Sequence, residues 1–514
     1  MTDREGGEVS RSESELRSVA REGGWAGVMG LASAALRYVN IAILTRVLGA
    51  QAYGLYALAN TVQMVLAIFL GLGLPATLVH DIASLAELGE WSRLRSAVRK
   101  SFVAASVAGM AGMTLVVAAA PWISTHLFHK PALVVPLVGL SLALPLSVLY
   151  SICSGGLQGF KRIRAKVFFD KIAHPLFFTL LLVFGWPLFR NVPYVLAAYG
   201  VAALLTFFLA SRSLGRYLSE RPPNGGGQKA TWGGLLGFSL PVMGQNFLSL
   251  FLLQSDLFVM GRYRGAAELA VYAVASRLAQ QAMGLATDAL SASLAPSFSA
   301  LMGRRDQSGL RRLFHTSTRW LCLVGGAIGL TLILGGLPVL GLFGPAFRQG
   351  YRVLCILVLG QMVSAGFGAN GTLITMTGHP KVNLVNSFIL GLGNLGLCLF
   401  LVPRYGALGA ASAAAGSLIM TNLVRAVEIY WILKIGPWDR TILKPFAALA
   451  AAAAVGGLAA VTLHPFVGAA AGLAVYLLVW YGIRPEPEDW DMLRRAWGKL
   501  RRGPTGGETG DARR

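Results

Sequence analysis

Apolar segments long enough to cross a lipid bilayer recur along nearly the whole chain, and this feature limits the fold more than any other. A helix needs about 20 mostly apolar residues to span the hydrocarbon core of a bilayer. Fourteen segments approach or exceed this length, at 23–47, 53–83, 98–124, 132–157, 168–189, 192–211, 233–261, 267–300, 314–340, 351–376, 384–402, 406–433, 442–463 and 465–483. The sequence therefore predicts an all-α polytopic membrane protein with about 14 transmembrane helices.

The composition agrees with this prediction and excludes several classes of protein. Of the 514 residues, 55% are hydrophobic and only 13% are charged, and the mean hydropathy is +0.60. A soluble globular chain has about 25% charged residues, so an ordinary soluble enzyme, a coiled coil and a disordered protein are all excluded. The four cysteines lie far apart in apolar segments, and we expect neither a disulfide framework nor a metal site from them.

The net charge of +22 follows the topology of the predicted spans. With fourteen spans, 34 of the 45 Lys and Arg residues fall on the side of the N-terminus, 8 on the other side and 3 inside spans. Positive charge concentrates on the cytoplasmic side of membrane proteins. We therefore expect a multi-pass protein of the cell membrane with both termini in the cytoplasm, and no nucleic-acid partner.

Loops and polar stretches divide the chain into six parts. These are a cytoplasmic tail at 1–22, an N-lobe of six spans at 23–211, a cytoplasmic linker at 212–232, a C-lobe of six spans at 233–434, two further spans at 435–483 and a basic cytoplasmic tail at 484–514. In the last part Trp490, Leu493, Trp497 and Leu500 have helical spacing, which predicts an amphipathic helix on the membrane surface.

The two lobes are related by an internal repeat at an offset of 216 residues. The segment Gly49–Ala59 (GAQAYGLYALA) aligns with Gly265–Ala275 (GAAELAVYAVA), with five of eleven positions identical. Each lobe has an even number of predicted spans, so both lobes enter the membrane from the same side. This arrangement predicts a pseudo-two-fold axis along the membrane normal, a design in which transporters bind substrate between the two halves.

The motif at residues 44–56 (LTRVLGAQAYGLY) resembles the Wzx-type polysaccharide, or oligosaccharide-lipid, flippases of the multidrug/oligosaccharidyl-lipid/polysaccharide exporter superfamily. The stretch at 373–381 (LITMTGHPK), followed by Asn386, resembles the same family less specifically. The resemblance covers about residues 20–480. It implies a fourteen-helix, two-lobed fold with a central cavity, and translocation of undecaprenyl-diphosphate-linked oligosaccharide across the cytoplasmic membrane.

Polar and charged residues inside the predicted spans indicate where a substrate would bind, because each ionisable one costs about 2.5–3.5 kcal/mol near the middle of a bilayer. In the first span Ser33, Arg37 and Asn40 share one helix face, and in the eighth span a polar stripe runs from Arg277 to Ser291. The candidate cavity residues are Arg37, Arg277, Asn40, Gln281, Gln63 and Gln245, with Asp256 and Asp288 as candidates for ion coupling or bracing.

Two interpretations of these residues remain open. In the first, Arg37 and Arg277 hold a diphosphate, since guanidinium groups match phosphate oxygens, while the Asn and Gln side chains meet sugar hydroxyls. In the second, pairs such as Arg277 with Asp288, or Arg37 with Asp256, are interhelical ion pairs that brace the lobes. No catalytic residue, cofactor or metal is expected in either interpretation.

The first expectation for function is thus a lipid-linked oligosaccharide flippase working by alternating access. The alternatives are a multidrug or cation antiporter of the same architecture, a flippase for a lipid II-type peptidoglycan precursor, a membrane enzyme and a scaffold without transport activity. We expect a monomer surrounded by membrane lipids, with a polysaccharide polymerase or glycosyltransferases as candidate partners.

Overall fold

The computed structural model describes residues 2–185, 191–220, 231–483, 486 and 489. The side chains of residues 1–28, 285, 286, 288, 289, 291–293 and 380 lie outside this description. All of the regular secondary structure in the described part is helical. The prediction of an all-helical protein is confirmed.

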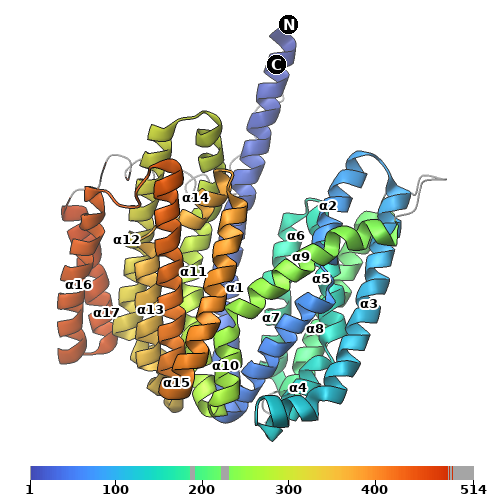
Figure 1. Cartoon of the computed structure of the whole chain (residues 1–514), viewed down its shortest axis with the longest axis horizontal. Coiled ribbons are helices and arrows are strands. Elements are labelled where there is room, and N and C mark those ends of the chain that lie inside the picture. Colours follow the sequence, from blue (N-terminus) through green and yellow to red (C-terminus); the bar gives the residue numbers. More distant parts are fainter. Residues whose placement is uncertain (1, 186–190, 221–230, 484–485, 487–488, 490–514) are drawn as a thin grey trace.

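The helices fall into a first group, which forms an N-terminal bundle, and a second group, which forms a C-terminal bundle beside it except for α9, which lies across the N-terminal bundle (Figure 1). The first group comprises α1 (Thr2–Leu70), α2 (Leu74–Glu87), α3 (Trp91–Trp122), η1 (Ile123–Leu127), η2 (Pro131–Leu133), α4 (Val134–Ser141), α5 (Leu144–Gly159), α6 (Ile163–Phe168), η3 (Phe169–Ala173), α7 (His174–Gly185) and α8 (Val192–Ser219). The second comprises α9 (Trp232–Leu253), α10 (Ser255–Tyr263), α11 (Ala266–Gly303), α12 (Gln307–Gly341), η4 (Pro345–Gly350), α13 (Tyr351–Ala365), α14 (Asn370–Met376), α15 (Pro380–Leu433), η5 (Arg440–Ile442), α16 (Leu443–Thr462) and α17 (Pro465–Gly482).

Nine helices of the described residues are long and apolar enough to cross a membrane, or eleven if two bent pairs are each counted as one span. The bent pairs are 131–141 with 144–159, bent by 43°, and 345–365 with 370–376, bent by 42°. The chain is therefore a multi-pass membrane protein, and the larger number of fourteen spans stays a prediction.

Two of the longest helices are broken by a glycine in a backbone conformation that other residues rarely adopt. Gly49 (φ 71°) interrupts α1, and Gly406 (φ 59°) interrupts α15. The chain changes direction at each break. Both halves of α1 contact α11, through Tyr38 before the break and Gly54 after it, and the second half slopes toward α2 (Figure 1).

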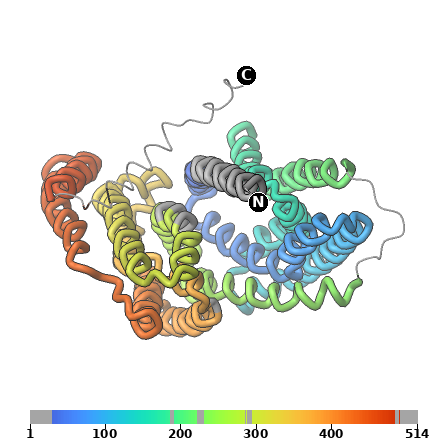
Figure 2. Tube along the Cα trace, turned by 90° about the horizontal axis from the view of Figure 1, so that it is seen from above, coloured from blue at the N-terminus to red at the C-terminus, as the bar shows by residue number. Residues whose placement is uncertain are grey.

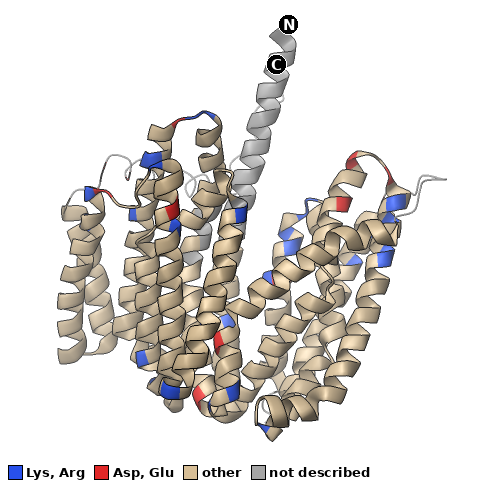
Figure 3. Ribbon diagram, viewed as in Figure 1, with Lys and Arg blue, Asp and Glu red and all other residues tan. Residues whose placement is uncertain are grey.

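Charged residues lie mainly toward the two ends of the bundles, and few lie along their middle (Figure 3). The N-terminal end of α1 and the α2–α3 and α11–α12 loops lie on the same side of the protein (Figure 1). We call this the N-terminal side and the opposite side the far side. At the α11–α12 loop the carboxylate of Asp306 accepts a hydrogen bond from the Gly309 amide at 2.8 Å, and this bond, together with that of Ser308, holds the pKa of the carboxyl group below its usual value.

Helix α9 contacts both bundles. An ideal Cβ atom on Gly73, just before α2, would lie 2.0 Å from the carbonyl oxygen of Ser239 in α9, and one on Gly391 in α15 would lie 2.7 Å from Leu252 near the other end of α9. Although α9 follows the predicted linker, which ends at residue 232, it therefore packs against helices of both bundles.

Helices α16 and α17 lie at the edge of the C-terminal bundle, away from the N-terminal bundle (Figure 2). They pack on α12 through a small cluster that includes Leu323, Leu330, Ala452 and the fully buried ring of Tyr476. These two helices extend the C-terminal bundle and make no part of the surface between the bundles.

Candidate functional site

The polar face predicted for the first span lies against the N-terminal bundle. Ser33 donates a hydrogen bond to the carbonyl oxygen of Lys171 in η3 at 2.8 Å, and the amide of Asn40 donates to that of Pro175 in α7 at 3.0 Å. Both side chains are buried. Arg37 lies between them on the helix, is half-buried, and its Nε atom is buried without a hydrogen-bond partner among the described residues.

A hydrogen bond joins the same stretch of α1 to α11 of the C-terminal bundle. The hydroxyl of Tyr38 donates to the carbonyl oxygen of Leu278 at 3.2 Å. Since Arg37 precedes Tyr38 and Arg277 precedes Leu278, the two arginines come from neighbouring stretches of facing helices. Arg277 is half-buried and lies close enough to Tyr53 and Tyr56, in the second half of α1, to interact with them electrostatically.

Several buried polar atoms near these arginines have no hydrogen-bond partner in the described structure. They are both amide atoms of Gln63, Oδ1 of Asn40, Oε1 of Gln281, the hydroxyl of Tyr53 and Nε2 of His174. His174 packs its ring against Tyr199 of α8, with the ring centroids 4.7 Å apart. A buried polar atom without a partner costs about 1–3 kcal/mol, so a group of them is typical of a place that takes up water or a ligand.

Gln245, in contrast, is an exposed residue of α9, and no hydrogen bond joins it to another candidate in the described structure. Arg37, Asn40, Gln63, Arg277 and Gln281 all come from α1 and α11. The structure thus brings five of the six candidate cavity residues onto two helices that pack together, and it leaves Gln245 on a third.

Asp256 is held by a tyrosine of its own bundle. The hydroxyl of Tyr272 in α11 donates to Oδ2 of Asp256 in α10, and the amide of Leu257 donates to Oδ1 at 2.8 Å. The carboxyl group is buried, with 4% of the residue exposed. No ion pair between Asp256 and Arg37 occurs in the described part of the chain, and the side chain of Asp288 lies outside it.

The sequence contained no indication of Tyr272 as a partner for Asp256, because 16 residues and a helix break at Arg264 separate the two. It also gave none for a buried ion pair on the N-terminal side of the C-terminal bundle. There Nη2 of Arg319 in α12 lies 2.7 Å from Oδ1 of Asp489, and both side chains are nearly inaccessible, at 5% and 2% exposed.

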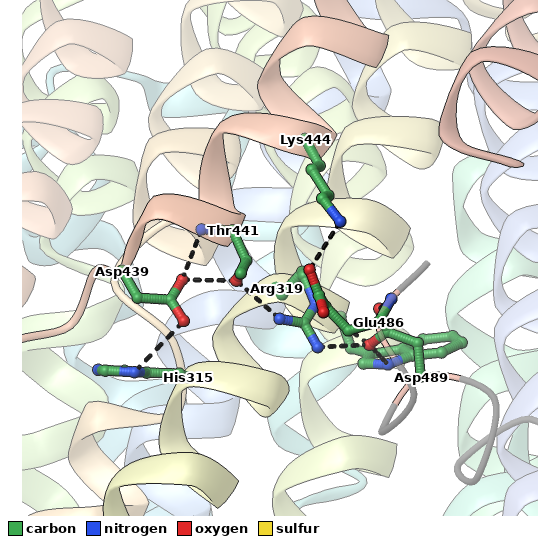
Figure 4. A network of polar contacts seen from close by, with 8 residues as sticks. His315, Arg319, Asp439, Thr441, Lys444, Glu486 and Asp489 are labelled. Atoms are coloured by element: carbon green, nitrogen blue, oxygen red, sulfur yellow. Dashed lines mark hydrogen bonds and ion pairs between the residues drawn. The ribbon is translucent and has the colours of Figure 1, made fainter. Parts of the chain in front are cut away.

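Further contacts extend this ion pair into a network (Figure 4). Trp320 Nε1 donates to the same Asp489 oxygen at 3.0 Å, and Arg319 Nη1 donates to the hydroxyl of Thr441 at 2.7 Å. Lys444 lies 2.7 Å from Glu486 in a second ion pair. The network fastens the start of the tail predicted at 484–514 to α12 and η5, whereas the amphipathic helix predicted there lies outside the described residues.

The residues that the structure describes contain no group of three or more His, Cys, Asp or Glu side chains that could hold a metal ion. The four cysteines are free thiols. The site can bind a ligand that carries an anion and hydroxyl groups, through the guanidinium groups of Arg37 and Arg277 and the amide groups around them.

Residues 19–302, more than half of the chain, match the model of a family described as polysaccharide biosynthesis protein. The chain belongs to this family. Residues 241–400 also match the MatE family model. The resemblance to polysaccharide flippases of the multidrug/oligosaccharidyl-lipid/polysaccharide exporter superfamily is confirmed, and the chain is a membrane transporter linked to polysaccharide biosynthesis rather than an enzyme.

Among curated proteins, the succinoglycan biosynthesis transport protein ExoT of Rhizobium meliloti (strain 1021) is 24% identical over 427 residues, which are 81% of this chain and 80% of the relative. Among solved structures, the lipid II flippase MurJ in an inward closed conformation has a TM-score of 0.69 at 14% identity, covering 90% of this chain and 98% of that one. An inward-facing multidrug resistance transporter of the MATE family has a TM-score of 0.65 at 15% identity, covering 79% and 98%. These likenesses confirm the fold of the superfamily.

Proposed function

We propose that the protein translocates undecaprenyl-diphosphate-linked oligosaccharide across the cell membrane by alternating access, with the diphosphate bound between Arg37 and Arg277. One observation carries the proposal. Two half-buried arginines lie on the facing helices α1 and α11, without an ion pair to any described carboxylate, among buried polar atoms that lack partners. Guanidinium groups bind diphosphate oxygens in pairs of hydrogen bonds, and the free amide groups suit sugar hydroxyls.

The family and its relatives support this class of substrate. ExoT, by its description, is a transport protein of succinoglycan biosynthesis, and MurJ is a lipid II flippase. A lipid II-type precursor shares the lipid diphosphate, and it remains the alternative substrate. For a cationic drug the site would need a free carboxylate, but Asp256 is engaged by Tyr272 and by the backbone.

The proposal includes fourteen spans, with both termini in the cytoplasm. Three more spans are added to the eleven counted above. Gly49 divides α1 into two spans, Gly406 divides α15 into two, and α11, with 38 residues, is a further span. The first twelve spans form the two lobes of the repeat and α16 and α17 complete the set. The head group enters between the bundles from the N-terminal side, while the lipid tail stays in the bilayer.

The membrane potential favours export in this direction. Each negative charge that moves outward gains about 2.3 kcal/mol per 100 mV of inside-negative potential. A diphosphate with about two charges gains roughly 4–5 kcal/mol per 100 mV, so the potential can bias transport without a coupled ion.

The experiment is translocation of a lipid-linked oligosaccharide by the full-length protein in proteoliposomes, with Arg37→Gln and Arg277→Gln as variants. Loss of a charged hydrogen-bonding group costs about 1.5–3 kcal/mol, so each variant should lower the rate by tenfold or more. Arg404→Gln is the matched control, because Arg404 is exposed and its recorded contacts with described residues, a hydrogen bond to the carbonyl oxygen and a cation–π contact with the ring, are both with Phe400 of its own helix. Rates like those of the unaltered protein in both test variants would overturn the diphosphate role.

A further inference from the structure

A second basic site lies away from the arginines of the proposed transport site, in a groove of about 430 Å³ between α3 and α8. Small-molecule sites in proteins have volumes of about 300–1,000 Å³. The groove is formed by the first turns of α3 and the last turns of α8, so it opens near the N-terminal side of the bundle. Helix α8 reaches the site around Arg37 and Arg277 through Tyr199, which lies 12 residues before the groove begins at Ser211.

The mouth of the groove carries two arginines of one helix face. Arg95 and Arg99 are four residues apart on α3 and both line the groove. Arg95 Nη2 donates to the carbonyl oxygen of Leu218 at 2.5 Å, which fixes it across the end of α8. Arg99 is exposed and forms no hydrogen bond or ion pair with a described residue. No Asp or Glu is among the described residues that line the groove.

The floor of the groove is apolar and is kept open by a glycine. Val98, Phe102, Leu214 and Leu218 line it. Gly215 of α8 also lines it, and a Cβ atom at that position would meet no atom within 4 Å. The groove therefore has a cationic mouth and an apolar floor, with space at residue 215 that a larger side chain would occupy.

Aromatic residues place this end of the bundle at the surface of the membrane. Lys100 Nζ lies 5.1 Å from the ring centre of Trp232, and the Arg162 guanidinium lies 4.7 Å from that of Tyr217. Trp and Tyr concentrate at the level of the lipid head groups, and long basic side chains extend toward the same level. A lipid lying along α3 and α8 would thus present its head group to Arg99 and its chain to Phe102.

We propose that this groove binds an anionic phospholipid, with the phosphate on Arg95 and Arg99 and an acyl chain on the apolar floor. Basic pockets between transmembrane helices bind anionic lipid head groups in this way. The site is separate from the transport site and holds a lipid of the surrounding leaflet rather than the transported one.

The test is native mass spectrometry of the full-length protein in detergent, titrated with phosphatidylglycerol and, in parallel, with phosphatidylcholine. Arg99→Gln removes the charge, and Gly215→Leu fills the groove while it leaves every charge in place. Arg99→Gln should weaken phosphatidylglycerol binding by about fivefold, the effect of about 1 kcal/mol per basic residue near a lipid surface. Gly215→Leu should also weaken it, because the leucine side chain takes the space of the acyl chain. Arg216→Gln is the control, since Arg216 is exposed on the same turn of α8 and does not line the groove.

Three outcomes would overturn the proposal. An equal loss in Arg216→Gln would show general attraction to the basic surface, and equal binding of phosphatidylcholine would show an apolar groove without head-group recognition. Displacement of the lipid by an equal concentration of inorganic phosphate would show a plain anion site. None of these outcomes bears on transport, so the proposed function is tested separately.

Discussion

The ammonium group of Lys130 donates a hydrogen bond to the carbonyl oxygen of Gly261, and this bond joins the two bundles on the far side. Lys130 precedes η2 of the N-terminal bundle, and Gly261 lies in α10 of the C-terminal bundle. Nearby, Arg46 Nε donates to the carbonyl oxygen of Leu342 at 2.8 Å, and the rings of Tyr53 and Phe347 meet edge to face at 6.2 Å. The described contacts therefore close the bundles against each other on the far side.

Removal of the Lys130 donor should loosen this closure. Lys130→Met keeps the aliphatic stem but loses a hydrogen bond that is worth about 1 kcal/mol at a partly exposed site, so the ratio of far-side-open to far-side-closed molecules should rise about fivefold. Spin labels at His129 and Tyr263, exposed positions of opposite bundles, report the change as a longer distance component. An unchanged distance distribution would show that the bond does not hold the bundles together.

Substitution of Gly54 should open the far side more than substitution of any polar residue in the same contact between the bundles. An ideal Cβ atom at Gly54 would lie 1.9 Å from the carbonyl oxygen of Ala266, so Gly54→Ala must push α1 and α11 apart. Overpacking of this kind costs about 1–3 kcal/mol, and we expect the same labels to report an opened far side. Gly200→Ala in α8 is the control, because its Cβ atom would meet nothing within 4 Å, and there the distances should stay as they are.

Variants at the hydrogen bond between Tyr272 and Asp256 distinguish two roles of the aspartate, bracing of the helices and binding of a coupling ion. If Asp256 braces α10 against α11, Asp256→Asn should keep transport close to normal, since the amide oxygen can accept from the Leu257 amide while the NH2 group donates to the Tyr272 oxygen. Tyr272→Phe leaves a carboxylate oxygen buried without its partner and should lower the free energy of unfolding by about 1–3 kcal/mol. Thermal unfolding in detergent and the proteoliposome assay measure the two effects. Loss of transport in a stably folded Asp256→Asn would instead indicate a role in ion coupling.

The buried pair of Arg319 and Asp489 should show strong coupling. Removal of one partner from such a pair costs about 3–5 kcal/mol, because the other charge stays buried alone. We expect Arg319→Ala and Asp489→Ala each to destabilise the C-terminal bundle by about this amount. The double variant should cost far less than the sum of both. Denaturant unfolding of the four proteins gives the coupling energy, and additive effects would show that the tail is not held by this pair.

The sequence alone determined the helical, membrane-spanning nature of the chain, because the length of an apolar run and the position of positive charge act locally and need no partner. It also determined the family through the motif at residues 44–56, and it placed Ser33, Arg37 and Asn40 on one face through helical periodicity. The hydrogen bonds of Ser33 and Asn40 to η3 and α7 agree with that face.

Only the tertiary structure decided which polar groups meet. The sequence allowed an ion pair between Asp256 and Arg37, yet in the structure the carboxylate of Asp256 in α10 accepts a hydrogen bond from Tyr272 in α11. The structure likewise brought Asp489 from the tail to Arg319, 170 residues away. The reason is physical: helical periodicity fixes the directions of side chains within one helix, whereas the packing of helices that are distant in sequence selects the group each side chain contacts.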